Sequence, residues 1–478
     1  MKNQISILIM FIALSLSLPQ NTWAQRSVPG VPQSTLYKDL PLQVDQHEFQ
    51  APDMAVIEAE DNADLMHYRV GVAVPINLNI DNSGYWTDLP DGGKIWRLSI
   101  KVEGAEALGV YYNSFWLPYG GELYLYNEEK THLIGAYTEE NNSPDCVFAN
   151  RLVEGDVVIL EYYQPAEQSI EPLISISEVA YNYRGVQFES SPERGGSVWC
   201  MINVNCPEGD NWQDEKKGVV KQYMKIGFSY YLCSGTLINN TSQNLTPYVL
   251  TAFHCGEGGT AANLNQWIFY FNYEAATCSG NWGPANYSMT GCSKKAEGSH
   301  DTGSDFLLLQ INYDVPVSYN AYYNGWDRTN IGADSGVNIH HPAGDIKKIS
   351  TYTDQLTSSQ WNNNGVLSHW KAWWAETVNG TSITEGGSSG SPIFSQDGLV
   401  VGDLTGGPVD NCNNPLYSLY GKVYWSWDMM GALSNQRLKP WLDPGNYGPE
   451  KWEGTYAGTE PSPDFSADQI NIQTGEAV

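Results

Sequence analysis

Pro247-Tyr-Val-Leu-Thr-Ala-Phe-His254-Cys255 is the stretch on which the fold prediction rests, because it is an apolar strand that ends in a histidine beside a cysteine. Two later stretches have a similar character. Gly303-Ser-Asp305-Phe-Leu-Leu-Leu-Gln310 places an acid at the start of an apolar strand. Gly386-Gly-Ser-Ser-Gly-Ser-Pro-Ile-Phe394 places a serine in a glycine-rich turn before another. Short apolar runs bounded by turn residues predict an all-β domain.

The order of these side chains favours nucleophilic catalysis by a serine. A serine hydroxyl is a weak nucleophile, so it needs a histidine base and an acid that fixes the histidine tautomer. Glycines on both sides of Ser389 allow the tight turn that aims backbone N–H groups at an oxyanion. The order His254, Asp305, Ser389 is that of chymotrypsin, unlike that of subtilisin or the α/β-hydrolases.

Each stretch alone has a simpler interpretation. A Gly/Ser-rich loop is more often a linker or turn, a buried histidine is more often a core residue, and an aspartate before a strand is more often a cap. All three in this order, in an exported β-domain with cysteines, favour a serine protease. Asp301 is the second candidate for the acid, but it lies in a polar loop, so we prefer Asp305.

The composition excludes several other classes of protein. A chain of 478 residues suggests two or three domains, at about 100–200 residues each. Hydrophobic residues make up 41%, which is enough for packed cores, and the 46 Gly, 17 Trp and 30 Tyr argue against an all-helical protein. The net charge of −29 would be repelled by phosphate, so we expect no nucleic-acid partner.

The first residues predict export from the cell. Lys2 precedes an apolar run from Ile5 to Leu18 and the small-residue site Thr22-Trp23-Ala24, which is typical of a signal peptide over residues 1–24. The competing interpretation is a membrane anchor, but the run is short for a span, and no other stretch is long and apolar enough. We therefore expect a secreted protein, extracellular or periplasmic, with no membrane span.

The rest of the chain divides into a lead, two β-rich domains and a tail. Residues 25–44 are polar and proline-rich and predict a loose lead, whereas residues 45–180 alternate apolar and polar side chains and predict a small β-sandwich. Residues 195–444 again read as short strands, closed by one helix near Trp427 to Leu442. Residues 445–478 are polar and acidic and predict a disordered tail.

Eight cysteines follow the signal peptide. An even number in an oxidising compartment favours disulfides, although the sequence alone leaves every pairing open. A zinc site is the competing interpretation, but the chain has no C-x-x-C pair and no H-E-x-x-H helix. The cysteines are Cys146, Cys200, Cys206, Cys233, Cys255, Cys278, Cys292 and Cys412.

A series of short motifs runs through the second domain in order. It comprises Cys200-Met-Ile-Asn-Val-Asn-Cys206-Pro-Glu-Gly-Asp210, Ser234-Gly-Thr-Leu-Ile-Asn-Asn240, Leu250-Thr-Ala-Phe-His254-Cys255, Gly325-Trp-Asp-Arg328, Ile339-His-His-Pro342, the GSSGSP loop, Gly406-Gly-Pro408 and Trp441-Leu-Asp-Pro444. With these motifs the domain resembles the bacterial lysyl endopeptidases, secreted proteases of the chymotrypsin-like class. The resemblance implies a double β-barrel with the site between the barrels, cleavage of peptide bonds, and neither a metal nor another cofactor.

The resemblance also implies a role for each matching residue. Ser389 would be the nucleophile, His254 the general base and acid, and Asp305 the orienting acid, while the N–H groups of Gly387 and Ser389 would form the oxyanion hole. The disulfides of the family map to Cys200–Cys412, Cys206–Cys278 and Cys233–Cys255. Cys146 and Cys292 are left over, either paired with each other or free.

The chain departs from the family at the primary specificity pocket. Lysine selectivity in the family rests on an aspartate, and the alignment puts Ser418 at that position. A buried lysine without a carboxylate is costly, so we expect a neutral pocket that prefers an uncharged residue. Asp403 and Asp410 lie nearby in the sequence as possible substitutes.

A second departure lies beside the triad. Family members stack a tryptophan on a histidine there; Trp361 matches the tryptophan, whereas Thr405 replaces the histidine. The substrate-binding residues implied by the resemblance are Ser418, Thr405, Gly406, Gly407 and Trp361.

The alignment places the mature start at Gly195, after Arg194, which makes residues 25–194 a propeptide. If the enzyme removes its own propeptide, arginine must fit its pocket; otherwise another protease makes the cut. The trypsin mode of activation needs an aspartate before the nucleophile, and that residue is Ser388. We therefore expect the propeptide to impose latency as a partner that covers the cleft or assists folding.

Two other functions stay open on the sequence alone. A secreted, acidic, aromatic-rich β-sandwich could bind carbohydrate or a protein ligand, and a pseudoprotease would keep the fold without turnover. Because His254, Asp305 and Ser389 are all intact, we prefer an enzyme whose partners are protein or peptide substrates.

Overall fold

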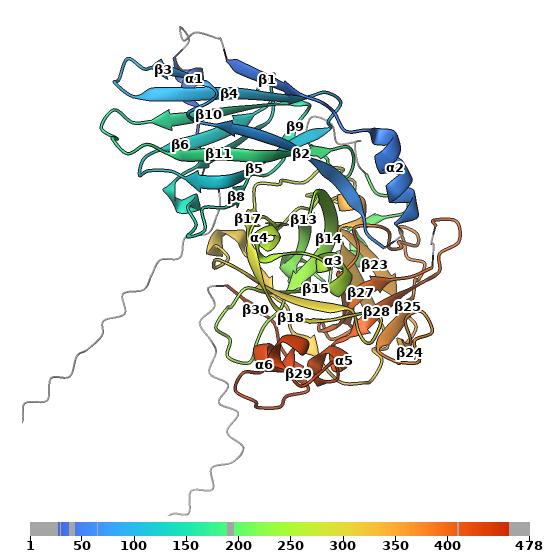
Figure 1. The fold of residues 1–478 in the computed structure, drawn as a ribbon. Helices are drawn as coiled ribbons and strands as arrows, with labels where there is room; N and C mark the ends of the chain where they lie inside the picture. Colours follow the sequence, from blue (N-terminus) through green and yellow to red (C-terminus); the bar gives the residue numbers. More distant parts are fainter. Residues whose placement is uncertain are drawn as a thin grey trace, which may run out of the picture.

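The computed structural model describes residues 27–28, 30–37, 44–64, 66–188, 196–408 and 411–457. The predicted signal peptide, the Arg194–Gly195 cleavage site and Asp410 therefore lie outside the described residues. Strands dominate the described chain, which confirms the predicted all-β class (Figure 1). In that part of the chain, no helix combines the length and the apolar character needed to cross a membrane.

The first unit is a two-layer β-sandwich. One layer has the strand order β1-β4-β10-β6-β7, with β3 beside β4, and the other contains β2, β11, β5, β8 and β9. Trp96, Leu98 and Ile100 of β4 are fully buried in the core between the layers. The elements of this unit are α1 (Gln33–Leu36), β1 (Asp45–Phe49), α2 (Met54–Ala63), β2 (Arg69–Asn79), β3 (Tyr85–Asp88), β4 (Lys94–Val102), β5 (Ala107–Trp116), β6 (Glu122–Tyr126), β7 (Leu133–Tyr137), β8 (Phe148–Ala149), β9 (Val153–Glu154), β10 (Val157–Gln164) and β11 (Leu173–Asn182).

The second unit contains two sheets, drawn from green to red in Figure 1. Its first sheet contains β17-β16-β13-β14, continued through β15 and β19 to β18. The strands of this sheet are β13 (Val219–Ile226), β14 (Ser229–Leu237), β15 (Tyr248–Ala252), β16 (Ile268–Tyr270), β17 (Ser288–Thr290), β18 (Cys292–Gly298) and β19 (Phe306–Ile311), and the short helices α3 (Phe253–Gly256) and α4 (Ala261–Leu264) follow β15.

The second sheet of this unit has the order β12-β23-β22-β26-β27-β28-β25-β24, with β21 and β29 attached beside β27. Among the described residues no pairing closes either sheet into a ring. The strands are β12 (Ile202–Asn203), β21 (Trp326–Asp327), β22 (Gly336–His340), β23 (Lys348–Tyr352), β24 (Thr357–Ser359), β25 (His369–Trp373), β26 (Pro392–Ser395), β27 (Val400–Gly406), β28 (Tyr417–Lys422) and β29 (Lys451–Trp452), and a separate pair joins β20 (Tyr322–Tyr323) to β30 (Thr455–Tyr456).

Strand β2 joins the two units. One edge of β2 pairs with β11 of the sandwich, and the other edge pairs antiparallel with β14, with Val72 opposite Ser229 and Arg69 opposite Tyr231. The two units therefore share one continuous sheet, and the N-terminal end of β2 points toward the second unit's helix α3 (Figure 1).

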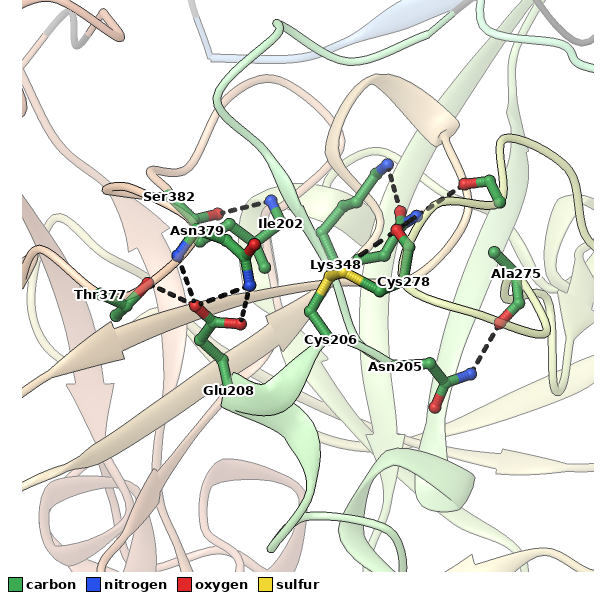
Figure 2. The surroundings of a disulfide bond; sticks show 12 residues. Ile202, Asn205, Cys206, Glu208, Ala275, Cys278, Lys348, Thr377, Asn379 and Ser382 are labelled. Carbon is green, nitrogen blue, oxygen red and sulfur yellow. Dashed lines mark hydrogen bonds between the residues drawn. A yellow bond between two sulfur atoms is a disulfide. The ribbon is translucent and has the colours of Figure 1, made fainter.

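Three disulfides join distant parts of the second unit: Cys200–Cys412, Cys206–Cys278 and Cys233–Cys255. They are the pairs that the family resemblance implies. Figure 2 shows that polar contacts reinforce the second one, because the Asn205 amide donates to the Ala275 carbonyl at 2.6 Å on one side. On the other side Glu208 accepts a hydrogen bond from the Thr377 hydroxyl at 2.6 Å. Cys146 and Cys292 are both free thiols.

The lead, the closing helix and the tail differ from the prediction. The described part of the lead packs on the sandwich, where the Val28 N–H donates to the Ala136 carbonyl at 2.8 Å. The single helix near Trp427 to Leu442 is wrong: α5 (Val423–Asp428) and α6 (Lys439–Leu442) are separated by a short 3-10 turn. Pro440 fits only in the first turn of a helix, so it begins a new one.

The disordered tail is wrong up to residue 457. The backbone of 449–457 forms β29 and β30, and the Arg328 guanidinium donates to the carbonyls of Pro449 and Gly448. Trp452 packs against the core of the second unit. These tertiary contacts stabilise a polar segment that has no apolar periodicity of its own.

Candidate active site

His254 and Asp305 meet because their strands are neighbours. His254 is the second residue after β15, Asp305 directly precedes β19, and the two strands pair antiparallel with Ala252 opposite Phe306. The His254 Nδ1 lies 2.7 Å from Asp305 Oδ2, and the His254 backbone N–H donates to Asp305 Oδ1 at 3.0 Å. Both oxygens of the carboxylate are therefore directed at one histidine.

This pair is buried and strongly coupled. His254 is 1% exposed and Asp305 0%. Burial alone would raise the pKa of Asp305, but the charge of His254 and the hydrogen bonds to the carboxylate outweigh it and hold that pKa well below its usual range. Asp305 is therefore ionised across the physiological range and able to keep the proton of His254 on Nδ1, which leaves Nε2 free as a base. Asp301, the other candidate acid, has a side chain that is 79% exposed.

The loop with Ser389 packs against β14 and against β15, the strand that precedes the histidine. The Ser389 carbonyl accepts a hydrogen bond from the Ser234 N–H at 2.8 Å, and the Ser234 hydroxyl donates to the Gly387 carbonyl at 2.9 Å. A side chain on Gly390 would collide with Thr251, so only glycine fits there. Ser234 adjoins Cys233, whose disulfide to Cys255 links this contact to the residue after His254.

The reactive groups of this loop have no internal partner. Ser389 is half-buried, and no residue that the structure describes accepts or donates a hydrogen bond to its hydroxyl, so no bond joins it to His254. Within the described ranges, the backbone N–H groups of Gly387 and Ser389 also donate to no acceptor. The two N–H groups are therefore available to a carbonyl oxygen from outside the chain.

Ser388 is held by His340, the first histidine of the motif Ile339-His-His-Pro342. The Ser388 Oγ lies 2.7 Å from His340 Nδ1 and accepts the Glu385 N–H at 3.2 Å. Burial lowers the pKa of His340 to about 3, so this ring is neutral. His341, the next residue, bonds instead to the Asp345 carbonyl at 3.0 Å, so the two histidines have separate partners.

No charged carboxylate is found at the predicted pocket position. Ser418 is 1% exposed, and its hydroxyl lies 2.7 Å from that of Thr384. Asp403 is also buried, and its carboxyl has no hydrogen-bond partner among the described residues. Burial, with a further contribution from the charge of Asp305, raises the pKa of Asp403 well above its usual value, so this group is neutral.

A tryptophan–histidine stack is present although Thr405 has replaced one histidine. The Trp361 ring stacks on His369 with centroids 6.1 Å apart at 29°, and His369 Nε2 bonds to the Thr405 hydroxyl at 3.0 Å. The edge of Trp361 also lies beside Gly406, and Gly407 lies against the Tyr417 carbonyl. The sequence analysis missed His369, and also His300, whose Nδ1 lies 3.6 Å from Asp305 Oδ1.

Residues of the first unit reach this site. His67 Nε2 lies 3.2 Å from the His254 carbonyl, with the two rings 6.0 Å apart. The Tyr68 carbonyl accepts the Leu232 N–H at 3.0 Å, and the Tyr68 ring lies over Gly386. The sequence offers no signal for this contact, because it depends on the pairing of β2 with β14.

One group of side chains has spacing that could suit a metal ion. Of the described residues, Cys233, His254 and Cys255 bring their ligand atoms within 4.8 Å of one another. The two sulfur atoms are joined in a disulfide, whereas a cysteine binds a metal only as a thiolate. This cluster is therefore not suited to a metal.

The chain is similar to several known proteins. Residues 194–421 match the family model described as lysyl endopeptidase, C-terminal domain. A lysyl endopeptidase of Pseudomonas aeruginosa is 27% identical over 367 residues, which cover 74% of this chain and 73% of the relative. Two solved structures are similar. The protease Anisep of Arthrobacter nicotinovorans is 18% identical, covering 44% of this chain and 91% of its own, with a TM-score of 0.33. A Glu endopeptidase is 15% identical, covering 48% and 89%, with a TM-score of 0.29.

Proposed function

We propose that the chain is a secreted serine endopeptidase of the lysyl endopeptidase-like type, which hydrolyses peptide bonds through an acyl-enzyme formed on Ser389. The observation that carries the proposal is the buried pair of His254 and Asp305, in which Nδ1 and Oδ2 are 2.7 Å apart. This pair fixes the tautomer that a general base needs, and Ser389 has a hydroxyl with no other partner among the described residues.

In the proposed mechanism the Ser389 Oγ attacks the carbonyl carbon of the scissile bond, and His254 Nε2 takes the hydroxyl proton. The negative charge that forms on the carbonyl oxygen accepts hydrogen bonds from the N–H groups of Gly387 and Ser389. His254 then protonates the leaving amine, the C–N bond breaks, and an ester to Ser389 remains. Water attacks the ester by the same steps, with His254 as base and then acid, which releases the acid product and restores Ser389.

Asp305 stabilises the charge that His254 gains in both halves of the reaction. Its carboxylate is buried and ionised, and so it interacts with the imidazolium in a medium of low dielectric constant.

We also propose that the primary pocket is neutral and selects an uncharged side chain. Support comes from Ser418, whose hydroxyl is already bonded to Thr384, and from Asp403, whose buried carboxyl is protonated. At these two described positions a lysine ammonium would thus find no ionised carboxylate to pair with, and burying it would be costly. A peptide library digested by the enzyme and read by mass spectrometry tests this; dominant cleavage after lysine would overturn it.

The last part of the proposal concerns residues 25–194, which we assign as a propeptide that blocks the site. The contacts of His67 and Tyr68 support it, because they cover the backbone of His254 and the loop that begins at Gly386. The Asp64 carboxylate accepts the N–H groups of Met66 and His67 at 3.0 and 3.1 Å, which turns the chain away from an extended path. A substrate binds extended, so this segment obstructs without being cut.

A fluorophosphonate probe tests the catalytic assignment, since it labels only an activated serine. We expect the label on Ser389 of the processed enzyme, mapped by mass spectrometry, and its loss in His254→Ala. Ser388 is the internal control, because His340 occupies its hydroxyl. A processed enzyme that hydrolyses no peptide and takes no label would overturn the proposal and favour a binding protein or a pseudoprotease.

The block by the propeptide needs a form that stays uncut. Gly195→Pro, which places a proline after the predicted scissile bond, should prevent processing whatever residue the pocket prefers and give a full chain that takes little label. Adding His67→Ala and Tyr68→Ala should then restore labelling of Ser389. Tyr119→Ala is the matched control, because that ring is 82% exposed on the sandwich. Labelling of the uncut chain as fast as the processed enzyme would contradict the block.

A further inference from the structure

Building on the proposed function, we propose that His300 is a positioning residue of this site: a second imidazole that shares the Asp305 carboxylate with His254. Its protonation then sets the acid side of the activity profile. None of the motifs in the sequence includes His300, which lies in the turn between β18 and β19.

Each oxygen of Asp305 faces a different imidazole, and Oδ1 also accepts the His254 backbone N–H at 3.0 Å. His254 Nδ1 is 2.7 Å from Oδ2, and His300 Nδ1 is 3.6 Å from Oδ1. The longer distance exceeds a good hydrogen bond, so the interaction with His300 is an attraction of charges. Because Asp305 is fully buried, this attraction is weakly screened.

Aromatic rings hold His300 in this position. Its ring lies between Phe253 and Trp361, with both centroid distances 6.3 Å. The His300 side chain is 16% exposed, and its Nδ1 is buried without a hydrogen-bond partner among the described residues. A polar atom aimed at a carboxylate, with no other partner, is what a residue acting through Asp305 would present.

The charges around His300 favour its protonated form. Asp305 faces Nδ1, Asp301 Oδ1 lies 3.4 Å from Nε2, and Glu257 adds a third negative charge. His369, across Trp361, is neutral, because burial lowers its pKa to about 4. Contact with Asp305 raises the pKa of His300 above its ordinary value, although burial opposes the shift, and the charges of Asp305, Asp301 and Glu257 add to it.

This arrangement has a consequence for catalysis. A protonated His300 neutralises part of the carboxylate that must stabilise the imidazolium of His254. In the free enzyme the form with His300 protonated therefore reacts more slowly than the form in which this ring is neutral. The acid side of the profile then contains two coupled ionisations instead of one.

The experiment measures kcat/KM of the secreted, processed enzyme from about pH 4.5 to about pH 8 with one peptide substrate. In His300→Gln the amide of glutamine still offers an N–H donor, but this side chain does not titrate. It should move the acid side to lower pH by about half a unit or more, with kcat at the plateau within about threefold of the original. Asp301→Asn should cause a smaller shift in the same direction.

A double variant separates an effect through His300 from a general effect of charge. Asp301→Asn should have no effect on the profile once His300→Gln is present. Asp210→Asn is the control, because Asp210 is exposed at the end of a 3-10 turn and is not one of the three acids that act on His300. Unfolding temperatures of all variants establish that they are folded.

Two results would overturn the inference: a His300→Gln profile that superimposes on the original, or an equal shift from Asp301→Asn in both backgrounds. Should His300→Gln fail to be secreted, Asp301→Asn still decides, since the absence of a shift refutes the inference. Failure of the proposed function is distinct, because the original enzyme would then take no fluorophosphonate label.

Discussion

Asp305→Asn is the substitution that most directly tests the catalytic assignment. Asparagine has nearly the shape of aspartate, so the packing around the buried side chain is kept. The substitution removes the negative charge and turns one acceptor into a donor. In the original enzyme Oδ1 lies 3.0 Å from the His254 backbone nitrogen and Oδ2 lies 2.7 Å from Nδ1. The single amide oxygen of the asparagine can take only one of these two positions.

The size of the effect follows from those two contacts. If the amide oxygen faces the backbone N–H, the amide NH2 faces Nδ1, and His254 must carry its proton on Nε2. That tautomer cannot accept the proton of Ser389. We expect kcat to fall about ten-thousandfold, which corresponds to about 5 kcal/mol of transition-state stabilisation. The loss should lessen at high pH, where hydroxide can replace the base.

The assay is hydrolysis of a fluorogenic peptide by the processed enzyme, with active sites counted by the fluorophosphonate label. Asp301→Asn is the matched control, since its side chain is 79% exposed and touches Asp305 only through His300. Its kcat at the plateau should be unchanged. A loss of less than about tenfold in Asp305→Asn would refute the reasoning, because the buried carboxylate would then contribute little to the reaction.

Three other substitutions address the pocket, the loop before the nucleophile and the disulfide beside the base. Ser418→Asp should create a preference for lysine and raise the ratio of kcat/KM between lysine and norleucine substrates by about tenfold or more; an original enzyme that already favours lysine would contradict a neutral pocket. Burial raises the pKa of Glu385 to about 7 from 4.5, so the folded protein keeps a proton there that the unfolded chain loses. The unfolding temperature should therefore fall as the pH rises through that window, and Glu385→Gln should flatten the dependence; an unchanged slope would show that other groups cause it. Replacing Cys233 and Cys255 together by serine should lower the free energy of unfolding in denaturant by about 3 kcal/mol and also lower kcat, whereas Cys146→Ser, at a free thiol, should leave both unchanged.

The sequence predicted the all-β class and the segments of the site because both depend on local pattern. The apolar runs of 247–252 and 306–309 form the paired strands β15 and β19. A polar residue at the end of each run then lies at the same edge of the sheet, which is how His254 and Asp305 meet. Here the local pattern and the tertiary structure agree.

The features that the sequence missed depend on contacts between distant segments. His300 and His369 have no local signal, because their contacts with Asp305 and Trp361 arise only when the loops fold together. The neutral state of Asp403 depends on burial, which a strand of the pattern Val-Val-Gly-Asp-Leu does not reveal. The strands at 451–456 depend on pairing with β21 and β20.

Strand β2 occupies a strand edge at which a peptide substrate could pair once the propeptide has left. It occupies the edge of β14 at Ser229 and Tyr231, and beyond it the Leu232 N–H donates to the Tyr68 carbonyl. When residues 25–194 leave, these backbone groups lose their partners, and an exposed strand edge favours pairing with another extended chain. A peptide substrate is such a chain, and pairing with β14 would bring it beside His254, where His67 lies in the uncut protein.

Release of the propeptide would thus uncover a binding edge along with the catalytic residues. Inhibition by added propeptide should accordingly be competitive with substrate. Noncompetitive inhibition would show that substrate does not bind at the edge of β14 that the propeptide covers.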